Sequence, residues 1–253
     1  MSAGLVLLAS FPVGRGALVV AAVFTGQLSI GWSNDYLDAE RDRAVLRLDK
    51  PLATGAAEPR IAGVAAVVAL FVTAGMSAAL GWPGGVALVV TVLCAWAYNL
   101  GLKATVFSWL PYALAFGFAP AAVTLSSLPP RWPPAWVLTV GALLGVAAHL
   151  ANALPDLRDD AATGIRGLPH RIGSRATALT AAALLLAASA VILVGSTGQP
   201  GVWRWGLFAS AVLVAVVSAR LAYRHPSSRR FFGAIIVIVL LDLASFALSG
   251  VSL

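Results

Sequence analysis

The sequence predicts an all-helical protein that crosses a lipid bilayer several times. Of its 253 residues, 60% are hydrophobic and only 11% are charged, whereas soluble domains carry about 25% charged residues. Eight separate apolar stretches approach the roughly 20 residues that a membrane-spanning helix needs. None of them shows the alternation of apolar and polar residues that is typical of outer-membrane barrels. The composition therefore excludes a soluble domain and a disordered chain, and the single cysteine, Cys94, excludes a disulfide scaffold or a zinc module.

The apolar stretches predict eight full spans, with turn and breaker residues between them. They are residues 14–34, 61–81, 84–102, 105–125, 134–154, 175–195, 203–223 and 231–251. Residues 1–13 are apolar but too short to span, and no basic residue precedes them as it would in a signal peptide. We expect them to form a short or partial N-terminal helix, or an interfacial segment. The whole chain, 1–253, is expected to form one integral-membrane domain.

The basic residues predict the orientation of the helices in the membrane. All Lys and Arg residues except Arg15, Arg131 and Arg204 lie at one set of helix ends. Because cytoplasmic loops carry an excess of Lys and Arg, these ends are expected in the cytoplasm and the C-terminus outside. This topology accounts for much of the net charge of +7, so no nucleic-acid partner is expected. The excess of Arg over Lys, with abundant Ala, Gly and Val, favours a bacterial inner (plasma) membrane.

Every acidic residue except Asp242 falls in one of two loops on the predicted cytoplasmic side. If the first span continues as a helix past residue 34, three aspartates at i, i+3 and i+7 share one of its faces. The second loop carries three aspartates at i, i+3 and i+4, which also share a face. The two sets are Asp35, Asp38 and Asp42, and Asp156, Asp159 and Asp160.

These two sets predict a metal–diphosphate site. Like charges on one helix face are destabilising, and a divalent cation would relieve that cost. Mg²⁺ binds one or two carboxylates and completes its coordination with waters and substrate phosphate oxygens. Basic side chains beside the aspartates are candidates for binding phosphate oxygens; these are Arg41, Arg43, Arg47, Lys50, Arg166 and Arg171. The alternatives are solvated loops of mixed charge and basic residues that only set the topology.

Four parts of the chain resemble, in order, the motifs of the UbiA superfamily of intramembrane prenyltransferases. Segment 34–42 resembles the NDxxDxxxD signature, and segment 156–166 resembles the second motif, DxxxD with a following G-x-K/R. Segment 47–55 resembles the R…RPLxSG segment, with Lys in place of the usual second Arg. Tyr98 and Lys103 resemble the family's Tyr…Lys pair after the fourth helix, at a spacing of five instead of the common four.

The resemblance implies a nine-helix bundle around a central cavity, which the two Asp motifs cap from the cytoplasmic side. It also implies Mg²⁺-dependent ionisation of an isoprenyl diphosphate. In that chemistry Asn34 would help to hold the metal–diphosphate, Lys103 and the loop arginines would neutralise the departing diphosphate, and Tyr98 would line the reacting centre. The metal ligands that it implies are Asp35, Asp38, Asp42, Asp156 and Asp160, to which the shared helix face adds Asp159.

Three functions fit these residues. The first is transfer of a prenyl group to a lipophilic acceptor, for which an aromatic compound is expected. The second is a UbiA-type terpene cyclase, in which the chain's own double bonds quench the cation. The third is a cation-binding transporter, which the position of the acids at helix ends disfavours because transporter sites lie near the bilayer midplane.

The roles of a few buried residues stay open at this point. Asp242 is an acid inside a span, which is costly and often functional, but it can also pair with a neighbouring helix. His149, in the apolar stretch that precedes the second Asp motif, either supports that motif or packs. Aromatic faces can stabilise a carbocation, but helix packing is the alternative for each candidate, with Tyr98 set apart by its motif; the candidates are Trp96, Tyr98, Trp109, Tyr112 and Phe116.

Overall fold

The computed structural model describes residues 11–195, 200–224 and 229–248, and all regular structure in these ranges is helical. The helices are α2 (Val13–Ala44), α3 (Pro51–Thr54), α4 (Pro59–Ala79), α5 (Trp82–Leu100), the 3₁₀ helix η1 (Leu102–Ala104), α6 (Leu110–Thr124), α7 (Ala135–Ala153), α8 (Leu157–Ala162), α9 (Leu168–Gly195), α10 (Val202–Arg224) and α11 (Arg229–Ala247). The predicted all-helical membrane fold is therefore confirmed.

The predicted number of full spans is not confirmed. Within the described residues, 6 helices are long and apolar enough to cross a membrane. The helical stretches Leu110–Thr124 and Gly233–Ala247 are apolar but shorter. The predicted span 105–125 loses its first turn, because residues 105–109 form turns after η1 instead of joining α6. The predicted N-terminal helix in residues 1–13 lies, apart from its last three residues, outside the described residues.

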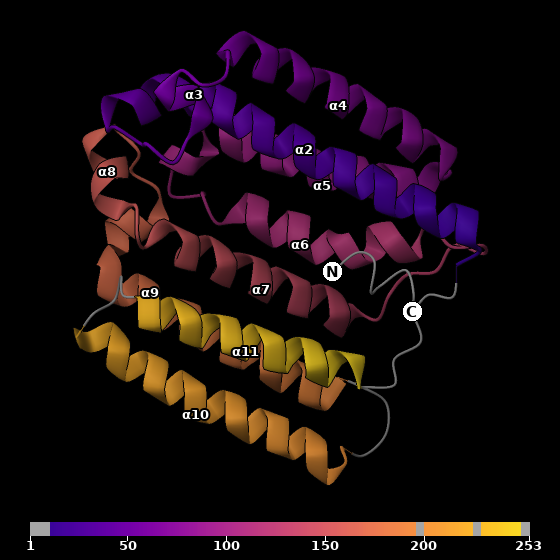
Figure 1. Ribbon diagram of the computed structural model, residues 1–253. Coiled ribbons are helices and arrows are strands. Elements are labelled where there is room, and N and C mark those ends of the chain that lie inside the picture. Colours follow the sequence, from indigo (N-terminus) through magenta and orange to yellow (C-terminus); the bar gives the residue numbers. More distant parts are fainter. Residues whose placement is uncertain (1–10, 196–199, 225–228, 249–253) are drawn as a thin grey trace.

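Figure 1 shows the long helices running side by side, with the short helices α3 and α8 at the same end of the bundle. Helix α2 is continuous over 32 residues and so carries the first Asp motif out of the span as helix, as the spacing predicts. The second motif begins at the junction of α7 and α8. The fold therefore brings the two motifs to the same end of the molecule from distant parts of the chain.

Hydrogen bonds between buried side chains fix α2 against its neighbours. Ser29 donates to the carbonyl oxygen of Ala66 on α4 at 2.8 Å, and the indole of Trp96 on α5 donates to Ser29 at 3.0 Å. One turn further along, the amide of Asn99 donates to Ser33 at 2.9 Å. Polar contacts of this kind join helices where water is absent. They set the rotation of α2 and hence the direction in which its aspartates point.

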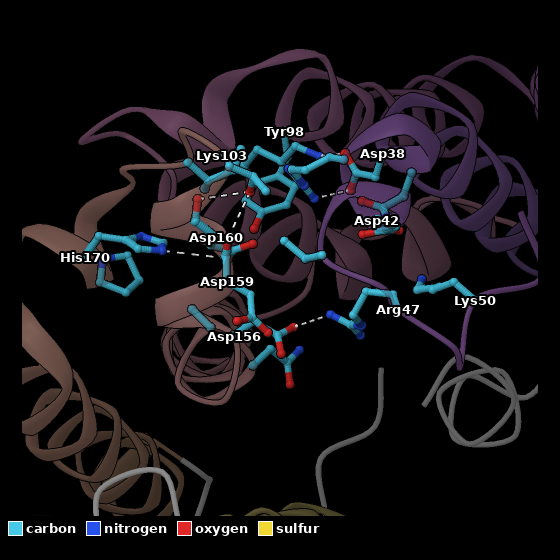
Figure 2. A pocket seen from close by; sticks show the side chains of 18 of the residues that line it. Asp38, Asp42, Arg47, Lys50, Tyr98, Lys103, Asp156, Asp159, Asp160 and His170 are labelled. Atoms are coloured by element: carbon cyan, nitrogen blue, oxygen red, sulfur yellow. Dashed lines mark hydrogen bonds and ion pairs between the residues drawn. The ribbon is translucent and has the colours of Figure 1, made fainter. Parts of the chain in front are cut away.

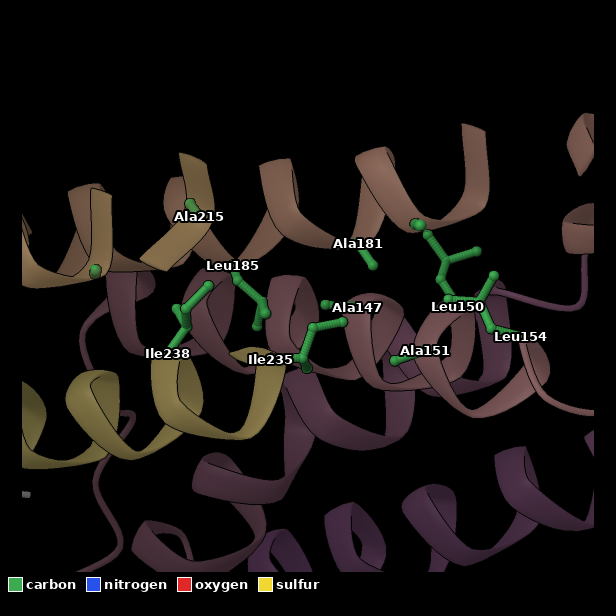
Figure 3. Packing of buried hydrophobic residues seen from close by; sticks show 11 residues of the cluster. Ala147, Leu150, Ala151, Leu154, Ala181, Leu185, Ala215, Ile235 and Ile238 are labelled. Carbon is green, nitrogen blue, oxygen red and sulfur yellow. The ribbon is translucent and has the colours of Figure 1, made fainter. Parts of the chain in front are cut away.

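Small residues allow the second half of the bundle to pack closely. Alanines and branched side chains of α7, α9, α10 and α11 form one buried cluster (Figure 3). Ala147, Ala181 and Ile238 are each 0% exposed. Where alanines lie at these contacts, helix backbones can approach closely and gain van der Waals contact, which drives helix association in lipid. This cluster supports α7, the helix that leads into the second Asp motif.

Candidate active site

A cavity of about 170 Å³ lies among the C-terminal ends of α2, α5 and α7 and the N-terminal end of α9. These ends are the ones predicted to face the cytoplasm. Both Asp motifs contribute to the lining of the cavity, together with the segment after α2 and the 3₁₀ helix η1. Its acidic residues are Asp38, Asp42, Asp156, Asp159 and Asp160, and its basic residues are Arg41, Arg47, Lys50 and Lys103. The cavity therefore combines two facing sets of carboxylates with basic residues from α2, from the segment after α2 and from η1 (Figure 2).

The contact between Asp38 and Lys103 joins the first motif to the loop after α5. The ammonium of Lys103 pairs with one oxygen of Asp38, and Arg41 pairs with the other oxygen at 2.7 Å. Gly101, with φ of +149°, turns the chain out of α5 so that η1 can place Lys103 there. Lys103 is only 8% exposed, and this burial lowers its pKa, while the bond to Asp38 opposes the shift.

Arg47 crosses the cavity from the segment after α2 to the second motif (Figure 2). Its guanidinium lies 3.3 Å from a carboxylate oxygen of Asp156 and also binds Asp49 through both carboxylate oxygens, at 3.0 and 3.1 Å. The hydrogen bonds from Arg47 lower the pKa of the exposed Asp49 carboxyl. This arginine therefore links the two halves of the site through ion pairs.

Asp160 is the most enclosed of the three aspartates of the second motif. It lies on α8, and His170 in the first turn of α9 approaches it, with 3.7 Å between Nε2 and a carboxylate oxygen. Burial raises the pKa of Asp160, while the nearby Arg41 acts in the opposite direction. A cation in the cavity would favour the ionised form of this carboxyl.

An aromatic wall adjoins the charged part of the cavity. The rings of Tyr98 on α5 and Tyr112 on α6 meet edge to face with centroids 5.1 Å apart. Phe116 stacks on Tyr112 at 6.1 Å, and His149 on α7 contacts both tyrosines. Of these residues, Tyr98 and His149 line the cavity itself. The site therefore has a charged end and an aromatic end.

The structure brings together all the residues predicted for the metal and diphosphate site except four. Asn34, Tyr98 and the other predicted residues line the cavity, whereas Asp35, Arg43, Arg166 and Arg171 do not. Asp35 binds Lys50 at 2.6 Å. Arg43 braces α2 against α3 by donating to the carbonyl oxygen of Leu52 at 3.1 Å, and Arg166 is exposed. Their predicted roles in metal or diphosphate binding stay predictions.

Sequence reasoning left out several residues that line the cavity. Asn152 lies on α7 four residues before Asp156 and lines the cavity. Counting back from the motif at helical spacing would have found it. His149, whose role the sequence left open between supporting the motif and packing, also lines the cavity. His170, which belongs to none of the sequence motifs, lies on α9 and also lines the cavity. It follows Pro169, a residue typical of a helix start.

The carboxylates do not form a preassembled metal cage. Among the described residues, no group of three or more His, Cys, Asp or Glu side chains is placed to hold one metal ion. Asp38 and Asp156 are instead paired with basic residues. Asp42 and Asp159 have no Lys or Arg partner among the described ion pairs. The donor set therefore suits a cation such as Mg²⁺, which takes few carboxylates and draws further oxygens from a substrate.

Comparison with known proteins identifies the family. The model of the UbiA prenyltransferase family matches residues 1–248. The chain belongs to this family. It is 31% identical to the digeranylgeranylglyceryl phosphate synthase of Halobacterium salinarum, over 85% of this chain and 79% of that protein. It is 27% identical to the bacteriochlorophyll synthase 33 kDa chain of Cereibacter sphaeroides, over 92% of this chain and 82% of that protein. The UbiA resemblance of the motifs is thus confirmed, and the chain is an enzyme, a prenyltransferase.

Solved structures of UbiA homologues share the fold. The apo structure of a homologue from Aeropyrum pernix K1 matches with a TM-score of 0.76 at 18% identity, over 96% of this chain and 93% of that chain. A homologue from Archaeoglobus fulgidus bound to GPP and Mg²⁺ matches with a TM-score of 0.64 at 17% identity, over 99% of this chain and 97% of that one. The UbiA membrane fold is therefore the fold of this chain.

Proposed function

We propose that this UbiA prenyltransferase uses Mg²⁺ to ionise an isoprenyl diphosphate and transfers the prenyl group to a lipophilic acceptor, with an aromatic compound expected. The observation that carries the proposal is the cavity with two facing carboxylate sets, four basic side chains and an adjoining aromatic wall. The Archaeoglobus fulgidus homologue binds GPP and Mg²⁺, which supports the same ligand classes here. The family assignment favours an enzyme over a cation transporter.

Mg²⁺ would be held by the aspartates that line the cavity, with Asp42, Asp159 and Asp160 free of Lys or Arg partners among the described ion pairs. Asp38 and Asp156 would exchange a basic partner for the metal. When bound, the ion supplies positive charge that stabilises the departing diphosphate. Since no cage of three acids exists among the described residues, metal and diphosphate would bind together.

The chain's own residues perform three further tasks in this proposal. Lys103, Arg41 and Arg47 offer donors to the diphosphate oxygens, where negative charge grows as the allylic C–O bond breaks. Tyr98 presents its ring beside the allylic cation, which aromatic faces stabilise. The helical bundle in lipid keeps water away from the cation. The isoprenoid tail is apolar and can enter from the bilayer.

We also propose that residues 1–253 form one domain in a bacterial inner membrane, with the cavity at its cytoplasmic side. The supporting observation is the position of the basic residues. Those of the cavity, Arg41, Arg47, Lys50 and Lys103, lie at one end of the bundle, and an excess of such residues is typical of cytoplasmic ends.

One assay tests this function and its alternatives. Membranes containing the protein receive Mg²⁺ and allylic diphosphates of several lengths, with and without candidate acceptors, and diphosphate release is measured. We expect release that depends on Mg²⁺ and acceptor and falls by at least about 10²-fold in Asp38→Asn and Asp42→Asn. The matched control is Glu40→Gln, an exposed acid of α2 outside the cavity.

The other outcomes separate the competing functions. Acceptor-independent release that yields a cyclic hydrocarbon would identify a terpene cyclase. If the wild type and Asp38→Asn both release no diphosphate under any condition, the prenyltransferase and the terpene cyclase are both contradicted. Loss of activity in Asp35→Asn would assign a role to an aspartate that does not line the cavity.

A further inference from the structure

His149 lies where the charged part of the cavity meets its aromatic wall. It lies on α7, seven residues before Asp156, and it lines the cavity although it is only 3% exposed. Its ring centroid lies 5.6 Å from that of Tyr98 and 5.0 Å from that of Tyr112. In the proposed function the diphosphate lies at the aspartates and the prenyl chain at the aromatic wall. In that arrangement, the allylic C–O bond between the diphosphate and the prenyl chain lies beside His149.

The contact with Ser108 favours one of the two neutral tautomers of His149. Ser108 is 0% exposed, and its Oγ lies 3.0 Å from His149 Nε2. The backbone N–H of Leu168 donates to the same Oγ at 3.0 Å. Among the described hydrogen bonds, Nε2 is the only acceptor for the hydroxyl proton of Ser108. Because a buried hydroxyl without an acceptor is costly, the hydroxyl donates to Nε2, and the imidazole proton is on Nδ1.

We propose that His149 is a catalytic residue whose Nδ1–H donates a hydrogen bond to the ester or α-phosphate oxygen of the isoprenyl diphosphate, with Ser108 as its positioning residue. The proposal rests on the proposed function. Nε2 is turned to Ser108, and none of the described hydrogen bonds involves Nδ1. Nδ1 is therefore the ring nitrogen that is available to donate a hydrogen bond to a ligand in the cavity.

The breaking of the allylic C–O bond favours a neutral hydrogen-bond donor beside it. When the allylic C–O bond breaks, its electron pair stays on the ester oxygen and the prenyl carbon becomes cationic. A fixed N–H at that oxygen stabilises the charge that develops. A neutral imidazole adds no positive charge beside the cation, whereas Lys103 and the arginines lie at the charged end of the cavity. The proton stays on Nδ1 throughout.

The packing around Ser108 connects this donor to Lys103. A Cβ atom at Gly167 would lie 2.5 Å from the carbonyl oxygen of Lys103 and 2.9 Å from Ser108 Oγ. The segment before α9 thus lies directly against both residues, and only glycine allows this approach. His149, Ser108 and the Lys103 segment are held as one unit at the edge of the cavity.

Three substitutions of His149 separate the two ring positions. His149→Asn keeps an N–H near the position of Nδ1, His149→Gln places its amide near that of Nε2, and His149→Phe keeps an aromatic ring without a donor. For the allylic diphosphate that the wild type turns over, we expect kcat to fall on the order of 10²-fold in the Gln and Phe variants. His149→Asn stays within about tenfold, and KM changes little because the bond strengthens in the transition state. Ser108→Ala lowers kcat by about tenfold.

A second measurement does not depend on turnover. The chain has three histidines, so ¹⁵N-histidine labelling gives few imidazole resonances, and His149→Asn identifies those of His149. We expect a protonated Nδ1 and an unprotonated Nε2 in the intact protein in detergent. Adding inorganic diphosphate with Mg²⁺ shifts the Nδ1 resonance, and Ser108→Ala produces a mixture of the two tautomers.

Several outcomes would overturn the proposal. These are a protonated Nε2, a His149→Gln variant more active than His149→Asn, or equal activities in the three variants, which would indicate a packing role. A wild-type chain that releases no diphosphate would contradict the proposed function instead, while the resonances with inorganic diphosphate would still test the hydrogen bond of His149.

Discussion

At the scale of single residues, two arginines that depart from the charge pattern have a structural role. Arg15 donates to the carbonyl oxygens of Leu80 and Ser126, just past the C-terminal ends of α4 and α6. Arg204 donates to two carbonyl oxygens in the last turn of α9, at 2.8 and 2.9 Å. The last carbonyls of a helix lack partners within it and carry partial negative charge. These arginines therefore cap helices at the predicted outer side.

Removing such a cap should destabilise the protein. Arg15→Ala leaves two helix ends without their donor, and we expect the free energy of unfolding to fall by about 2 kcal/mol. Thermal unfolding of the detergent-solubilised protein measures this as a lower Tm. Arg131→Ala is the matched control, because Arg131 is exposed and its side chain takes part in none of the described hydrogen bonds or ion pairs. An equal loss of stability in both variants would contradict the capping role.

The structure also shows the surroundings of Asp242, the acid inside the last span. It is 2% exposed, lies on α11 and accepts a hydrogen bond from Ser189 of α9. It does not line the cavity. Of the two interpretations left open by the sequence, the structure supports pairing with a neighbouring helix. A buried polar pair of this kind joins two helices inside the bundle.

At the scale of elements, glycines on α7 allow α6 and α7 to pack in close contact. A Cβ atom at Gly145 would lie 2.4 Å from the carbonyl oxygen of Tyr112 and 2.7 Å from Cβ of Phe116. A Cβ at Gly141 would lie 2.4 Å from the carbonyl oxygen of Phe116. This close approach sets the distance between Tyr112 on one helix and His149 on the other.

A methyl group at this contact should therefore affect both stability and activity. Gly145→Ala forces α6 away from α7, and we expect a loss of about 1–3 kcal/mol in unfolding free energy, with slower diphosphate release because the aromatic wall moves. Gly75→Ala on α4 is the control, since nothing lies within 4 Å of its Cβ position. There the better helix propensity of alanine should stabilise by up to about 1 kcal/mol. If both variants gain stability, the helices are not in tight contact.

At the scale of the whole molecule, the arrangement of charge predicts a topology that can be measured. In a Cys94→Ala background, single cysteines are introduced as Leu48→Cys, in the segment after α2, and Leu128→Cys, after α6. Both positions are well exposed, at 81% and 69%. With a membrane-impermeant maleimide, we expect Leu48→Cys to react in inside-out vesicles and Leu128→Cys to react in intact cells. The reverse pattern would show that the cavity faces outward.

The sequence was a reliable guide wherever the signal is local. Apolar length predicts helices, and helical spacing predicts that Asp38 and Asp42 share a face of one continuous helix, which α2 confirms. Lys103, 65 residues from Asp38 along the chain, was expected at the site only through the family motif. The structure supplies the contact itself, an ion pair between the two. The bond between Arg47 and Asp156 has no local signal, because it depends on how two loops meet.

By itself, the sequence determined a helical membrane protein, its family and two acidic motifs, because hydropathy, spacing and residue type are properties of short segments. Only the tertiary structure decided that Asp35 binds Lys50 beside the cavity, that Arg43 braces a helix, and that His149 lines the cavity. Those outcomes depend on the rotation and separation of packed helices. Interhelical hydrogen bonds and glycine contacts between distant segments set both, and no short stretch of sequence encodes them.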